Sequence, residues 1–200
     1  MRKFLIDEIN KNGKKYILYL MIIIVGIFIG TFYFSKSYNN ENSYVTIEET
    51  ISFIKNGKID YSILLANYLK RDLLELFILI FISISLLYKY GSYIFFCYKG
   101  FTFGFLISFL IRNLTGAKGI LFSFGTILLP NIIKIPVFLF CHFYLALLFK
   151  SVIDRDYENK YTILKELIVK VGAVVLIIII NCFFNTFIFN NILVIFKNIF

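Results

Sequence analysis

Charged residues are scarce in this sequence, and the residue types that build metal sites are scarcer still. Only 16% of the 200 residues are charged and 60% are hydrophobic, whereas an average soluble domain is about 25% charged. The single histidine, His142, and the three cysteines, Cys97, Cys141 and Cys182, all lie within apolar runs. These positions argue against a metal site and against a structural disulfide. We expect His142 to hydrogen-bond within a helix bundle.

Enzyme motifs are absent as well. The sequence contains no His-Glu-x-x-His metal site, no Gly-x-Ser-x-Gly turn and no glycine-rich phosphate loop ending in Lys-Ser or Lys-Thr. It also offers no intramembrane pair of aspartates for proteolysis. The sequence therefore predicts no catalytic residue, no cofactor and no enzymatic activity.

The hydrophobic residues gather in runs that are long enough to cross a bilayer. A spanning helix needs about 20 mostly apolar residues, and uniformly apolar runs favour helices over the alternating strands of a barrel. We predict an all-α, polytopic transmembrane helical bundle that forms one domain over residues 1–200. Its five spans are 16–34, 73–90, 93–111, 131–149 and 171–193.

The charges that remain flank these runs. A basic head, residues 1–15, predicts a retained signal anchor with a cytoplasmic N-terminus. Five spans then place residues 35–72 and the C-terminus outside the cytoplasm. The net charge of +9 predicts contact with anionic membrane lipid and not with nucleic acid.

The outer segment 35–72 shows helical spacing of its apolar residues. Thr46 and Glu49 have capping-box spacing, and Asp60 can cap a second short helix that contains Ile63. The pattern predicts two amphipathic outer helices. They form either an ordinary connector or a partner-binding surface.

Glycines four residues apart occur in two of the predicted spans. Gly26 and Gly30 lie in the first span, and Gly100 and Gly104 lie in the third. Such pairs let two helix backbones approach closely in lipid. We predict helix packing within the chain, with a homo-oligomer as the alternative.

Glycine and proline also interrupt the apolar sequence further along. Gly116 and Gly119 permit a tight turn, and Pro130 disfavours helix at Leu129. Because residues 119–129 are too few to span a bilayer, they predict a short re-entrant or interfacial helix before the span 131–149.

A broken helix of this kind raises the alternative of a membrane carrier. Broken helices line transport sites, so Lys99, Asn131 and Lys134 could mark a pathway. Against this, no Asp or Glu lies in the middle of any predicted span, and a proton- or sodium-coupled carrier usually needs one. The two lysines can also snorkel or pair with backbone carbonyls. We therefore favour a structural role for them.

Residues 98–136 resemble the stage II sporulation protein M family. The resemblance is carried by Lys99, Gly100, Phe101, Gly104, Gly116, Gly119, Pro130, Asn131 and Pro136. Length, basic head and number of spans are similar too, and the bias toward residues with AT-rich codons suits a clostridial spore-former. The chain departs from the family where Asn131 directly follows Pro130, because many members carry a Gln before the Asn.

This resemblance implies a role in endospore formation. The chain would be a non-enzymatic scaffold in the mother-cell and septal membrane during engulfment of the forespore. It would recruit two peptidoglycan-remodelling partners, stage II sporulation proteins D and P, which carry the enzymatic activity. The alternative is a transporter or permease subunit with a broken-helix site near Pro130.

Overall fold

The chain folds into long α-helices in a computed structural model that describes residues 2–37, 61–86, 88–114, 116–153 and 160–199. These residues contain no β-strand. The helices are α1 (Arg2–Ser37), α3 (Tyr61–Ile84), α4 (Tyr88–Asn113), α5 (Ala117–Ser123), a π-helical turn (Phe124–Leu128), α6 (Leu129–Ile153) and α7 (Lys160–Ile199). The predicted all-α class is confirmed.

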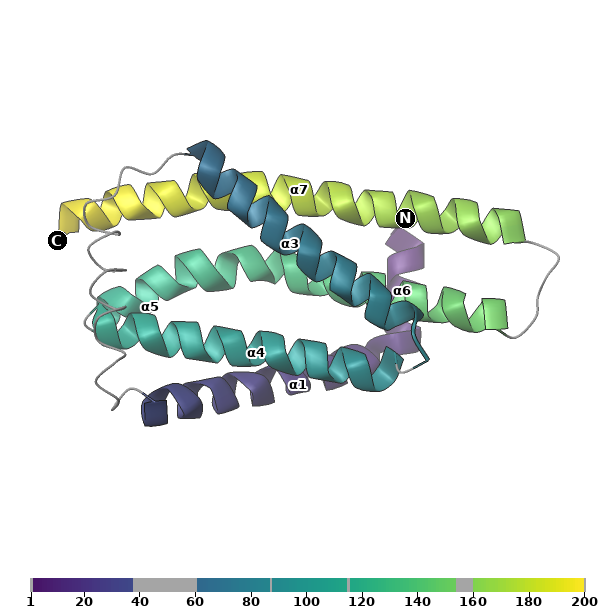
Figure 1. The fold of residues 1–200 in the computed structure, drawn as a ribbon, viewed down its shortest axis with the longest axis horizontal. Coiled ribbons are helices and arrows are strands. Elements are labelled where there is room, and N and C mark those ends of the chain that lie inside the picture. The colour runs from purple at the N-terminus through teal and green to yellow at the C-terminus, as the bar shows by residue number, and fades with distance from the viewer. Residues whose placement is uncertain (1, 38–60, 87, 115, 154–159, 200) are drawn as a thin grey trace.

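Successive helices run in alternating directions (Figure 1). Helices α1, α4 and α7 point one way, while α3 and α6 point the other, so the two termini lie toward opposite ends of the bundle. Helix α3 crosses the bundle obliquely and contacts α4, α6 and α7. This oblique path places the middle of α3 against three other helices.

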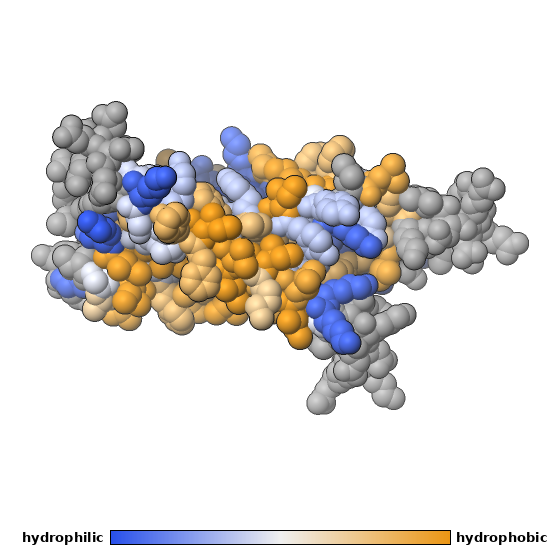
Figure 2. All heavy atoms as spheres, turned by 90° about the horizontal axis from the view of Figure 1, so that it is seen from below, coloured by the Kyte–Doolittle hydropathy of each residue, from blue (hydrophilic) through white to orange (hydrophobic). Residues whose placement is uncertain are grey.

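Four stretches of helix are long and apolar enough to cross a membrane. They are Gly13–Ser37, Tyr88–Asn113, Ala117–Leu147 and Ile168–Ile188. Large apolar side chains cover their outer surfaces; Phe28 and Phe32, for example, are 72% and 74% exposed. Figure 2 shows hydrophobic side chains in a band across one face of the molecule. A soluble monomer rarely exposes so large an apolar surface. In a bilayer these side chains face lipid, and the chain is a membrane protein.

Helix α3 differs from the predicted second span, 73–90. It begins at Tyr61 and ends at Ile84, and the chain then reverses through a tight turn into α4. The predicted separate helix after Asp60 is therefore wrong, because Leu65 and Leu69 pack against the core and continue α3. The predicted outer helix that contains Thr46 lies outside the described residues.

The sequence predicts a break in the helix at Pro130, but the chain stays helical there. Helix α5 covers part of the predicted 119–129 helix, but the π-helical turn joins it directly to α6. The wider π turn and nearby polar side chains accommodate a proline inside a membrane helix. Asn131 Nδ2 donates to the Ile127 carbonyl at 2.6 Å, and Thr126 Oγ1 donates to the Phe122 carbonyl at 2.7 Å. Residues 117–147 consequently form one candidate span.

A seam of glycines joins α1 to α4. The backbone of Gly26 lies against Cys97 and Gly100, and a Cβ atom on Gly26 would lie 3.0 Å from the Gly100 Cα atom. Gly30 contacts the Phe101 carbonyl, and Gly104 contacts the Ile27 carbonyl. The two glycine pairs therefore pack against each other within one chain. The parallel helices approach so closely that side chains there would collide with backbone.

Adding one methyl group to this seam should destabilise the fold. In Gly100→Ala the new Cβ would meet the Ile23 carbonyl of α1, and overpacking of this kind costs about 1–3 kcal/mol. The matched control is Gly172→Ala on α7, where a Cβ would have nothing within 4 Å. Unfolding of both variants in mixed detergent micelles, followed by circular dichroism, measures the difference. Equal stability of the two variants would contradict the close approach of α1 and α4.

Candidate functional site

Two carboxylates lie near the middle of α3, inside the bundle. Asp72 and Glu75 are three residues apart, so they share one face of the helix. Asp72 is completely buried, and the Glu75 side chain is 16% exposed. The sequence had suggested that no acidic residue lies in the middle of a span. None of the four candidate spans contains an Asp or Glu, and α3 is not among them. Asp72 and Glu75 lie near the middle of α3 because this helix extends well before residue 73.

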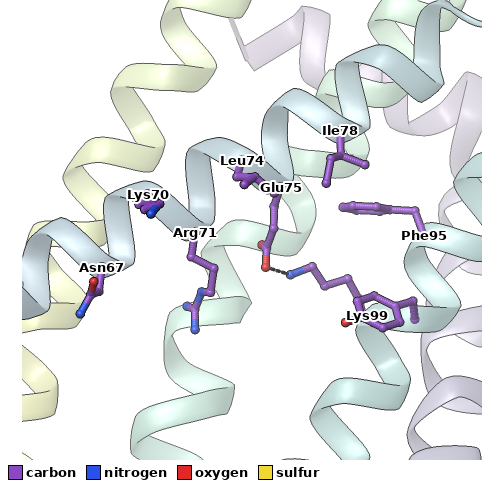
Figure 3. Close-up of a pocket in the computed structure, with 9 residues that line it drawn as sticks. Asn67, Lys70, Arg71, Leu74, Glu75, Ile78, Phe95 and Lys99 are labelled. Carbon is purple, nitrogen blue, oxygen red and sulfur yellow. Dashed lines mark ion pairs between the residues drawn. The ribbon is translucent and has the colours of Figure 1, made fainter.

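Lysines from two other helices neutralise these carboxylates. Lys134 of α6 places its Nζ atom 2.6 Å from Asp72 Oδ1 and 2.6 Å from Glu75 Oε2. Lys99 of α4 pairs with Glu75 Oε1, as the dashed line in Figure 3 shows. We call Asp72, Glu75, Lys99 and Lys134 the ion cluster. It contains two acids and two bases, and it ties α3 to α4 and α6.

Two further groups lie against Asp72. Cys182 of α7 donates its thiol to Asp72 Oδ2 at 3.6 Å. On the outer side, Arg71 Nε donates to Asp72 Oδ1 at 3.2 Å, while the arginine side chain stays 54% exposed. Asp72 thus has partners from α3, α6 and α7. A buried charge is costly unless it is paired and hydrogen-bonded, and Asp72 satisfies that requirement.

A second polar network lies around His142 and joins α1, α3, α4 and α6. Ser83 Oγ donates to the Leu79 carbonyl at 2.6 Å, so its contact with His142 Nδ1 at 2.8 Å has the imidazole as donor. The other ring nitrogen, Nε2, lies 3.0 Å from the Tyr19 hydroxyl. Tyr19 also lies 2.6 Å from Ser92 Oγ. His142 is therefore hydrogen-bonded within the bundle, and the described residues contain no group of three or more metal-ligating side chains.

Two asparagines on α7, Asn181 and Asn185, are buried. Asn181 Nδ2 lies 3.4 Å from the Pro130 carbonyl and donates to it. The Oδ1 atoms of Asn181 and Asn185 are buried and accept no hydrogen bond within the described part of the chain. These buried amide oxygens could each accept a hydrogen bond from a further donor.

A groove opens between α3 and α4, beside the ion cluster (Figure 3). Its volume is about 510 Å³, within the range of roughly 300–1,000 Å³ that is typical of ligand sites. Six α3 residues and three α4 residues line it: Asn67, Lys70, Arg71, Leu74, Glu75, Ile78, Phe95, Tyr98 and Lys99. The Glu75–Lys99 ion pair forms part of its wall.

The residues that carry the family resemblance do not converge on one site. Lys99 belongs to the ion cluster, whereas Gly100, Phe101 and Gly104 contribute to the seam with α1. Gly116 adopts a positive φ of 55°, which glycine allows in the turn before α5. Gly119 packs against Ile111, and Pro130, Asn131 and Pro136 lie along α6. Their roles in the structure are therefore local.

Asp72 and Glu75 are the site residues that the sequence reading missed. The sequence predicts a span that begins at residue 73 and so places Asp72 in the outer segment 35–72. A usable signal was present, because Lys99 and Lys134 lie in predicted spans and buried lysines need acidic partners. Asp72 and Glu75 are at the edge of the neighbouring run and could have been proposed as those partners.

Comparisons with protein-family models, with curated proteins and with solved structures find no match for the chain.

The ion pair between Asp72 and Lys134 should be energetically coupled. Lys134→Gln leaves two buried carboxylates short of a cation and should cost about 3–5 kcal/mol of stability. The double variant Asp72→Asn/Lys134→Gln should lose less stability than the sum of the losses in the two single variants. The difference, the coupling energy, should be about 0.5–3 kcal/mol. Unfolding in mixed micelles measures all four proteins of the cycle. Lys89→Gln, on an exposed lysine of α4, is the control for loss of a cation.

Strict additivity in this cycle would contradict the pairing. So would equal stability of Lys134→Gln and Lys89→Gln.

Proposed function

We propose that this protein is a non-enzymatic membrane scaffold of endospore formation. In this role it recruits peptidoglycan-remodelling proteins to the septal membrane for engulfment of the forespore. The partners proposed by resemblance are stage II sporulation proteins D and P. The proposed location is the cell membrane, with the N-terminus in the cytoplasm and residues 38–60 outside.

The observation that supports a scaffold best is the closed pairing of the ion cluster. At mid-bundle each carboxylate pairs with a lysine from another helix, and Asp72 and Lys134 are almost completely buried. Helices held in this way form a rigid unit, since moving one of them would separate charges inside the bundle. Rigidity suits a protein that presents a fixed surface to partners.

The resemblance and the glycine seam support the same proposal. Gly100 and Gly104, which belong to the family-like motif, also hold α4 directly against α1. The basic head and the alternation of helix directions are consistent with a cytoplasmic N-terminus and a C-terminus on the other side.

A pull-down from sporulating cells tests the proposal. Replacing residues 38–60 with a Gly-Ser linker of equal length should abolish co-purification of the two partners. The control replaces residues 154–159, which connect the end of α6 to the start of α7. This variant should still co-purify both partners. Retention of both partners by the first variant, or release of peptidoglycan fragments by the purified protein alone, would contradict the scaffold.

A carrier remains the second candidate, and one observation favours it. Asp72 and Glu75 are acidic residues inside the bundle, near the middle of α3. The π-helical turn and the unpartnered oxygens of Asn181 and Asn185 lie on neighbouring elements. Solute uptake by the purified protein in liposomes, lost in Asp72→Asn, would establish a carrier in place of the scaffold.

A further inference from the structure

The groove between α3 and α4 is polar toward the start of α3 and has apolar side chains further along, beside the Glu75–Lys99 ion pair. Its α3 wall consists of residues spaced three and four apart, which therefore share one face of the helix. Asn67, Lys70 and Arg71 come first, toward the start of α3, and Leu74 and Ile78 follow deeper along the helix. Phe95 of α4 adds to the apolar part, as Figure 3 shows.

The groove also carries an excess of positive charge. Lys70, Arg71 and Lys99 line it, while Glu75 is its only carboxylate. Glu75 is already paired with Lys99 and Lys134, and Asp72 behind the wall is shared between Lys134 and Arg71. Lys70 is exposed and pairs with no described residue. Uncompensated cations next to hydrocarbon favour a counter-anion.

We propose that this groove binds an anionic phospholipid. The phosphate lies at Lys70 and Arg71, where both side chains can donate charge-assisted hydrogen bonds. An acyl chain lies along Leu74, Ile78 and Phe95. It covers the apolar surface of these three side chains, which the lipid headgroups would otherwise contact. The lipid enters from the leaflet in which α3 begins, because the polar end of the groove faces that way. The site does not depend on the scaffold role and goes beyond it.

Both the positive charge of the groove and its apolar part favour an anionic phospholipid over other ligands. A free phosphate would satisfy the cations but leave the apolar half of a groove of about 510 Å³ empty. A zwitterionic lipid would fill the apolar half but bring its own cation close to Lys70 and Arg71. Only an amphiphile with net negative charge matches both ends.

The test uses the full chain purified in detergent and native mass spectrometry with short-chain phosphatidylglycerol. Lys70→Gln combined with Arg71→Gln should weaken binding about 30-fold, since each basic residue contributes roughly five-fold in affinity for anionic lipid. The matched control is Lys14→Gln combined with Lys15→Gln, two adjacent exposed lysines on α1. It should change the affinity less than the groove variant does.

A second pair of variants keeps every charge. Leu74→Trp should fill the groove and reduce phosphatidylglycerol binding, whereas Leu73→Trp, on the neighbouring residue outside the groove lining, should not. Phosphatidylcholine should bind more weakly than phosphatidylglycerol, and inorganic phosphate should not displace the lipid. Unchanged binding in the Lys70/Arg71 and Leu74 variants would overturn the proposal. Equal affinity for phosphatidylcholine, or displacement by an equal concentration of phosphate, would overturn it as well.

Discussion

The ion pair between Asp72 and Lys134 is the contact on which the arrangement of the helices depends. Both groups are buried between helices of a membrane protein, and Lys134 lies in the candidate span Ala117–Leu147. An unpaired charge at such a buried position has neither water nor a counter-ion. Pairing requires α3 and α6 to meet at a fixed depth and rotation. Glu75 extends the requirement to α4 through Lys99, and the Cys182 thiol brings α7 against the same carboxylate. One polar centre thereby fixes four helices that otherwise present similar apolar surfaces.

Two other features of the fold complete the arrangement around the ion cluster: the contacts that hold α1 and the π-helical turn before α6. Helix α1 has no part in the ion cluster and is held instead by the glycine seam and by Tyr19. The π-helical turn before α6 bears on the cluster directly. Each residue of an α-helix advances the chain by about 100°, so the extra residue in a π turn rotates all later side chains by about that amount. Because Lys134 follows the π turn, its direction toward Asp72 depends on this rotation. The turn beside Pro130 therefore has a structural role.

The sequence predicts the parts of this fold that depend on local pattern. Apolar runs predict five spans, and four helical stretches of the described residues are candidate spans; α3, which covers most of the predicted span 73–90, is not among them. The spacing of Gly26, Gly30, Gly100 and Gly104 identifies the residues of the α1–α4 seam. The ion cluster could not be read in the same way. Asp72 and Glu75 lie among charged residues at the edge of an apolar run, and their burial follows from packing of α3 against α6 and α7. Helical continuity through Pro130 likewise depends on the π turn and on side-chain donors such as Asn131, which no local rule supplies.

The pairing of Asp72 with Lys134 can be observed directly by solid-state NMR on the protein in lipid bilayers. With ¹⁵N in the lysine side chains and ¹³C in the aspartate carboxyl groups, a close pair dephases the lysine signal. The structure places Lys134 Nζ 2.6 Å from Asp72 Oδ1, so the wild-type protein should show dephasing that disappears in Asp72→Asn. A wild-type spectrum without dephasing, or dephasing that persists unchanged in Asp72→Asn, would contradict a buried ion pair at the centre of the bundle.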